Sequence, residues 1–136
     1  MPLVFKPTKK IFTTTSEFKK FFEDKYVLAL DKDEASLIYY KSLFPKSVIF
    51  NNSVEALEVS KIQKFDLFIL DLYQYPLNGV EVIEKFKKLE KNKETPSLLL
   101  TSTIYNKEFF EKFDYYLFKP VNVLDLYLAA HKLMQK

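Results

Sequence analysis

Short apolar runs alternate with longer amphipathic stretches along most of this chain, and this alternation constrains the fold more than any other feature. The runs are too short for helices, and we interpret each one as a strand that is buried on both faces. They are Tyr26–Leu30, Val48–Phe50, Leu67–Leu70, Leu98–Leu100 and Tyr115–Phe118. Strands separated by helices predict an α/β fold with a doubly wound, five-stranded parallel sheet and helices on both faces.

The amphipathic stretches between the runs show apolar residues at helical spacing. The expected helices are Asp33–Phe44, Ser53–Gln63, Asn78–Glu90 and Asn122–Gln135. Ser53 is a plausible cap for the start of its helix. Residues 25–136 account for the whole pattern, and the 136-residue length suits one domain with one core.

Residues 1–24 differ from the rest, and we treat them as an N-terminal extension made of an arm and a short helix. The segment KKIFTTT fits an extra strand or an extended arm. The segment SEFKKFFEDK places Phe18, Phe21 and Phe22 on one side of a helix, with Ser16 available as its cap. We favour packing on the domain's own surface over a role in docking or dimerisation.

Composition excludes several classes of protein. The chain has no cysteine and one histidine, His131, so disulfides, thiolate sites and multi-histidine zinc sites are excluded. All 21 basic residues are lysine, and without arginine we expect no nucleic-acid partner. No apolar run is long enough for a membrane span and the N-terminus lacks a secretory apolar core, so we expect a cytoplasmic protein. Nothing indicates the oligomeric state.

Polar residues follow four of the predicted strands. Asp31, Asp71, Thr101 and Lys119 each stand where a strand ends. The carboxyl ends of parallel strands meet at one edge of the sheet, where open α/β sheets bind their ligands. Two carboxylates, a hydroxyl and an ammonium at one edge suggest a site for a phosphoryl group, with a carboxylate as nucleophile and a divalent metal to neutralise charge.

The chain's single glycine, Gly79, excludes the usual nucleotide-binding loops. A P-loop ATPase, a GTPase and a Rossmann dehydrogenase all need several glycines close to a phosphate group. The phosphoryl group is therefore not expected to arrive on a nucleotide held by such a loop.

Four segments, LALDKDEASL, DLFILDLYQYPLNGVEV, TPSLLLTS and YYLFKP, resemble the signature segments of bacterial response-regulator receiver domains. These domains have the CheY-like fold, which is a flavodoxin-like arrangement. The resemblance implies that Asp71 is the phosphoacceptor and that Thr101 and Lys119 contact the phosphoryl group. It also implies that Tyr116 is the aromatic switch residue. The alternative is that Tyr116 is simply a buried aromatic in a strand, as Tyr115 beside it would be.

The same resemblance implies a magnesium site made of Asp31, Asp71 and the main-chain carbonyl of Tyr73. Receivers usually have two adjacent acids here, whereas this chain has Lys32 in the second position. Losing a carboxylate ligand and gaining a positive charge should weaken metal binding. The Lys32 ammonium either sits among the aspartates in place of the metal, or extends to water, or marks a domain that has lost phosphotransfer.

We therefore expect a single-domain receiver of two-component signalling, phosphorylated on Asp71 by a histidine kinase or phosphotransfer protein. It would signal by binding an unidentified downstream protein and would not be an enzyme beyond its own phosphorylation and dephosphorylation. The main alternative is a phosphorylation-independent pseudo-receiver that acts as an interaction module. A small hydrolase or phosphatase with Asp71 as nucleophile is a weaker third possibility. The short segment before Tyr115 leaves room for only a short fourth helix, near 106–113.

Overall fold

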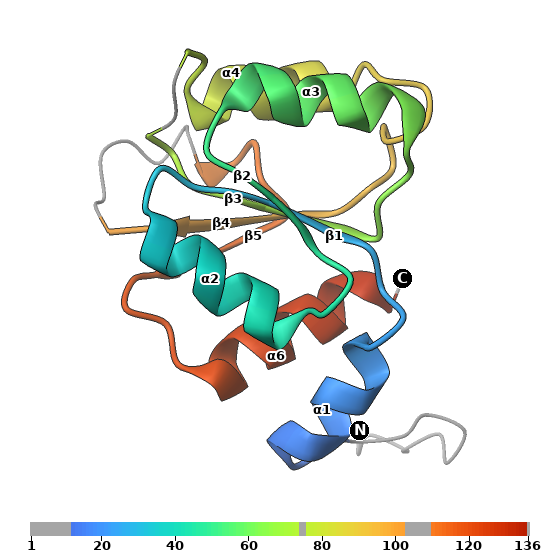
Figure 1. Cartoon of the computed structure of the whole chain (residues 1–136), viewed down its shortest axis with the longest axis vertical. Coiled ribbons are helices and arrows are strands. Elements are labelled where there is room, and N and C mark those ends of the chain that lie inside the picture. Colours follow the sequence, from blue (N-terminus) through green and yellow to red (C-terminus); the bar gives the residue numbers. More distant parts are fainter. Residues whose placement is uncertain (1–11, 74–75, 103–109, 136) are drawn as a thin grey trace, which may run out of the picture.

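A parallel sheet forms the centre of the protein in the computed structural model, which describes residues 12–73, 76–102 and 110–135. Within these residues the five strands run in the order β2-β1-β3-β4-β5 (Figure 1). They are β1 (Val27–Leu30), β2 (Val48–Phe50), β3 (Leu67–Leu70), β4 (Ser97–Thr101) and β5 (Tyr115–Phe118). The helices are α1 (Thr15–Phe22), α2 (Glu34–Leu43), α3 (Ser53–Ile62), α4 (Gly79–Phe86) and α6 (Val123–Met134). The predicted doubly wound α/β fold is confirmed.

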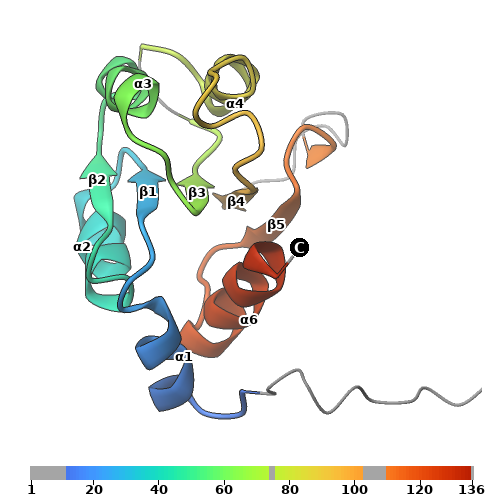
Figure 2. The ribbon, with the colours of Figure 1, turned by 90° about the vertical axis from the view of Figure 1, so that its right-hand side faces the viewer.

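Helices cover both faces of the sheet because side chains of a strand point alternately to its two faces. Val27 and Ala29 of β1 enter the cluster beneath α2 and α6, and Leu28 and Leu30 enter the cluster beneath α3 and α4. Figure 2 shows the resulting layers, with α3 and α4 on one side of the sheet and α2 and α6 on the other. All four β1 side chains are buried, so a continuous apolar run was the correct signal for this strand.

The expectation that every strand is buried on both faces is wrong for the two edge strands: β2 is only half-buried, and β5 is more exposed. Tyr115, Tyr116 and Phe118 are between 42% and 48% exposed. The reason is position: β5 is at the edge of the sheet, and among the described residues β4 is the only strand that pairs with it. Aromatic side chains favour strands at an edge as well as in a core, so the apolar run correctly identified the strand but not its burial.

Two helix caps differ from the expected ones. Asn52, and not Ser53, caps α3, because its side chain accepts hydrogen bonds from the backbone N–H groups of Val54 and Glu55. Thr14, and not Ser16, caps α1 in the same way. The α4 helix also ends at Phe86, earlier than Glu90, and gives way to turns. Residues 106–109, half of the expected fourth helix, and residues 1–11 of the expected arm lie outside the described residues.

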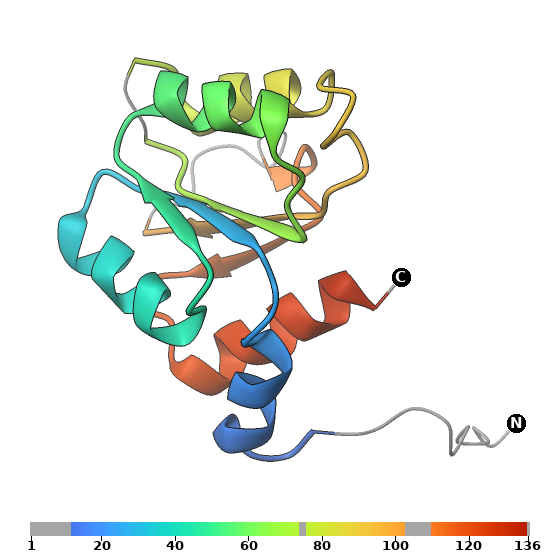
Figure 3. The ribbon, with the colours of Figure 1, turned by 45° about the vertical axis from the view of Figure 1, so that its right-hand side comes forward.

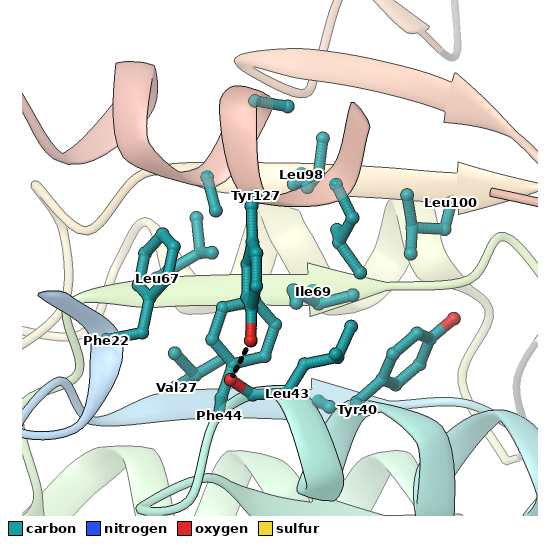
Figure 4. Close-up of a cluster of buried hydrophobic side chains, with 14 of the residues drawn as sticks. Phe22, Val27, Tyr40, Leu43, Phe44, Leu67, Ile69, Leu98, Leu100 and Tyr127 are labelled. Carbon is teal, nitrogen blue, oxygen red and sulfur yellow. Dashed lines mark hydrogen bonds between the residues drawn. The ribbon is translucent and has the colours of Figure 1, made fainter. Parts of the chain in front are cut away.

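The α1 helix packs beside α6 at the lower end of the molecule (Figure 3). Phe18 and Phe22 of α1 are buried, and the ring of Phe22 lies 5.0 Å from the rings of both Phe44 and Tyr127. Figure 4 shows Phe22 beside Tyr127, whose hydroxyl donates a hydrogen bond to the Leu43 carbonyl at 2.8 Å. Within the described residues, no helix combines the length and apolar character that crossing a membrane needs.

Candidate functional site

Backbone hydrogen bonds bring the candidate residues together at the carboxyl ends of the strands. The Asp71 N–H donates to the Leu30 carbonyl at 3.1 Å, which places Asp71 beside Asp31 just past β3 and β1. The Lys119 N–H donates to the Thr101 carbonyl at 2.8 Å, which continues the pairing of β5 with β4. The backbone at Asp71 and Lys119 therefore continues the parallel pairing beyond the strands, and this places their side chains at the carboxyl-end edge of the sheet.

The Lys119 ammonium bridges the two aspartates. Its Nζ lies 2.7 Å from Asp31 Oδ2 and 2.8 Å from Asp71 Oδ2. Both aspartates are buried, at 1% and 6% exposure. Burial by itself lowers the pKa of Lys119, but hydrogen bonds to Asp31 and Asp71 and their negative charges outweigh it, so the pKa is raised. One cation thus compensates two buried carboxylates, which would otherwise repel each other.

Other donors fix the orientation of each carboxylate. Asp31 Oδ1 accepts from the backbone N–H of Asp33 at 2.9 Å, and Asp71 Oδ1 accepts from the backbone N–H of Tyr73 at 3.3 Å. The Tyr40 hydroxyl also donates to Asp31 Oδ2, at 3.3 Å. Burial, and then the negative charge of Asp31, raise the pKa of Tyr40 well above its usual value, so the hydroxyl stays protonated.

Tyr40 is the residue of this site that sequence reasoning missed. Its spacing from Leu37 and Phe44 assigns it correctly to the apolar face of α2, and it is 3% exposed. A tyrosine on a buried face needs a hydrogen-bond partner for its hydroxyl, and that requirement was the available signal. The sequence contained no indication that the partner would be Asp31.

Lys32 does not take the place between the aspartates, so the first interpretation of this residue is corrected. Its side chain is exposed, and its ammonium lies 5.5 Å from the centroid of the Tyr73 ring. Lys119 occupies the position between Asp31 and Asp71 instead. The next residue, Asp33, caps α2 and accepts from the Ser36 hydroxyl at 2.8 Å, and this hydrogen bond lowers the pKa of Asp33.

Thr101 and Tyr116 occupy different environments. Thr101 is fully buried at the end of β4, where its carbonyl accepts from the backbone of Lys119. Tyr116 is 42% exposed, so the interpretation of this residue as a buried strand aromatic is wrong. Its ring stacks on that of Phe110, with centroids 4.6 Å apart and planes at 15°.

The backbone that follows Asp71 is held by a close approach of Gly79 and by a hydrogen bond to Ser53. A Cβ atom on Gly79 would lie 2.5 Å from the carbonyl oxygen of Asp71, so this helix start approaches the strand end more closely than any side chain allows. The buried Ser53 hydroxyl accepts from the backbone N–H of Leu77 at 2.8 Å. These contacts fix Leu77 and the start of α4 against the candidate site.

The oxygen donors of the site are of the kind that binds magnesium, but they are few. Asp31 and Asp71 supply two carboxylates that already share one cation, and Mg²⁺ accepts one or two carboxylates while keeping several waters. Among the described residues, no cluster of three or more acidic or histidine side chains is placed to hold a metal ion. The observed donors therefore fit a weak Mg²⁺ site rather than a complete protein cage.

No protein-family profile matches the chain. Two curated relatives, both named probable transcriptional regulator ycf29, are 33% identical over 57 residues in Porphyra purpurea and 30% identical over 92 residues in Pyropia yezoensis. These matches cover 42% and 65% of this chain, and only 27% and 41% of the relatives' lengths.

Solved structures are more informative about the fold. A CheY-like receiver domain from Methanospirillum hungatei is 25% identical, with a TM-score of 0.75 over 81% of this chain and 93% of its own. The receiver domain of a sensor histidine kinase from Pseudomonas aeruginosa, solved with magnesium in its active site cleft, has a TM-score of 0.76 at 14% identity, over 82% and 98%. The chemotaxis protein CheY4 of Vibrio cholerae has a TM-score of 0.75 at 21% identity, over 80% and 98%.

Proposed function

From the fold of CheY-like response-regulator receiver domains, which this chain has, we propose a signalling role in which Asp71 accepts a phosphoryl group. One observation supports this role above all others. The Asp71 carboxylate is 6% exposed, lies at the end of a central strand, and shares the Lys119 ammonium with Asp31. We infer a signalling protein rather than an enzyme that turns over an external substrate.

The transfer we propose uses phosphohistidine of a histidine kinase or phosphotransfer protein as the donor. An oxygen of Asp71 attacks phosphorus, the phosphorus–nitrogen bond breaks, and the imidazole leaves with its electron pair. The product is an acyl phosphate on Asp71. Lys119 is already hydrogen bonded to Asp71 Oδ2, so its ammonium would stand close to the negatively charged oxygens of a phosphoryl group that bonds to Asp71.

Four further residues complete the proposal. Asp31, Asp71 and the main-chain carbonyl of Tyr73 would hold Mg²⁺, which when bound neutralises charge on the phosphoryl oxygens. The Thr101 hydroxyl would contact the phosphoryl group from the end of β4. Tyr116 is exposed on β5, so an inward movement on phosphorylation would change the surface offered to a downstream protein.

A second function is favoured by two observations. Lys32 stands where a receiver has its second acid, and Lys119 already satisfies both remaining carboxylates. Such a pocket is stable without phosphorylation, and the domain would then act as a constitutive interaction module. This pseudo-receiver would keep the same fold and the same partner-binding surface.

Chemical phosphorylation distinguishes the two functions. We expect incubation with acetyl phosphate and Mg²⁺ to add one phosphoryl group to the wild-type chain, measured as a mass gain on the intact protein. The gain should vanish in Asp71→Asn. Asp24→Asn is the matched control, because Asp24 is exposed beside Lys25 in the turn before β1. No mass gain at saturating reagent, together with no spectral response to beryllofluoride, would favour the pseudo-receiver.

A further inference from the structure

Tyr40 connects the apolar core to the candidate site. Its ring lies in the core cluster beneath α2, and in Figure 4 its hydroxyl points toward the carboxyl ends of the strands. The hydroxyl donates to Asp31 Oδ2 at 3.3 Å. At 3% exposure the ring is fixed by packing, so the position of the hydroxyl is set by the core and not by solvent.

The Asp31 carboxylate is engaged on both oxygens. Oδ1 accepts from the Asp33 backbone at 2.9 Å, and Oδ2 accepts from Lys119 at 2.7 Å and from Tyr40 at 3.3 Å. These donors come from the loop after β1, the end of β5 and the face of α2. A carboxylate held from three directions is fixed in one orientation.

A divalent cation at this pocket would compete with those donors for the same lone pairs. Mg²⁺ needs near-ideal geometry and short bonds to oxygen, whereas Asp31 Oδ2 already serves two donors. We propose that Tyr40 is a positioning residue whose hydroxyl holds Asp31 in this arrangement and thereby lowers the affinity of the pocket for Mg²⁺. The inference rests on the proposed function for the identity of the cation.

The test is a Mg²⁺ titration of the full chain, in which binding is measured by NMR chemical shifts or by calorimetry. Tyr40→Phe removes the hydroxyl and keeps the ring. We expect it to bind Mg²⁺ about threefold to tenfold more tightly than the wild type, because a single long hydrogen bond to the Asp31 carboxylate is removed. Tyr39→Phe is the matched control, because the Tyr39 hydroxyl donates to the Val121 carbonyl, away from the aspartates. The control should stay within twofold of the wild type.

A double-mutant cycle separates positioning from general loosening of the fold. If Tyr40 acts through Asp31, Tyr40→Phe should change Mg²⁺ affinity little when Asp31→Asn is already present. A gain that persists in that background would overturn the proposal, and so would unchanged or weaker binding by Tyr40→Phe. Failure of acetyl phosphate to modify Asp71 would instead remove the proposed function, and it would leave the measured effect of Tyr40 on cation binding intact.

Discussion

At the scale of single residues, charge and position together determine what each side chain can do. Lys32 and Lys119 have the same chemistry, yet one is exposed over the Tyr73 ring and the other bridges two buried carboxylates. Lys119 extends from the end of a strand in the sheet, whereas Lys32 belongs to the loop after β1. The sequence placed Asp31 and Asp71 at strand ends, but it did not determine which ammonium would join them.

Gly79 is the residue at which the smallest change should have the largest local effect. In Gly79→Ala the new Cβ would lie 2.5 Å from the Asp71 carbonyl oxygen and 2.9 Å from Leu72 Cα, and neither backbone atom can move cheaply. Overpacking of this kind costs about 1–3 kcal/mol. We expect the free energy of unfolding, measured in urea, to fall by about that amount.

The control for this prediction is Lys85→Ala, an exposed substitution in the same helix, which should change stability by less than about 0.5 kcal/mol. Amide NMR shifts of Gly79→Ala should also move at Asp71. Equal stabilities for the two variants would show that α4 can withdraw from the end of β3 without cost.

At the scale of elements, β5 departs most from what local sequence indicates. The β5 strand is apolar and yet exposed, because it ends the sheet. The α1 helix is amphipathic like a surface helix, and its apolar side packs against α6 and the end of α2. We propose that residues 1–24 form an extension whose helix is part of the domain's core.

Truncating Phe22 tests the contribution of α1 to the core. The side chain is fully buried against Phe44 and Tyr127, and removing such a ring costs about 3–5 kcal/mol. We expect Phe22→Ala to lower the free energy of unfolding by that amount in urea. Lys20→Ala, exposed on the same helix, should have almost no effect. A loss below about 1 kcal/mol for Phe22→Ala would mean that α1 detaches without disturbing the domain.

At the scale of the whole molecule, α1 and α6 meet around the only histidine. The His131 ring lies 4.7 Å from the rings of Phe12 and Phe21 and 5.6 Å from that of Phe18. Burial among these rings lowers the pKa of His131. The folded state therefore favours the neutral imidazole, while the unfolded chain takes up a proton near the ordinary pKa of 6.5.

This difference predicts how stability depends on pH. The contribution of His131 is fully present above pH 6.5 and is lost as the pH falls through its lower folded-state pKa. We expect the urea midpoint to drop between pH 7.5 and pH 5, and to drop less in His131→Phe. Because the chain has one histidine, the variant removes all imidazole titration. An identical pH response in both proteins would contradict burial of His131.

The sequence by itself determined the order of strands and helices along the chain, the parallel sheet, and the identity of the polar residues at the edge of that sheet. These features follow from local periodicity and length, because apolar runs of three to five residues between longer amphipathic stretches favour strands between helices. The four segments that resemble receiver domains specified the same fold, and structural neighbours confirm it.

Only the tertiary structure decided which side chains meet. The contact of Tyr40 with Asp31 depends on how α2 packs against the end of β1. The choice of Lys119 over Lys32 joins segments that are far apart in sequence, and the exposure of β5 follows from its position at a sheet edge. Such contacts arise when packing fixes side chains from several elements at once, and no periodicity within one element encodes them. Local sequence patterns therefore determine the fold class of this chain, whereas the hydrogen bonds and ion pairs of its acidic pocket depend on the packing of the assembled core.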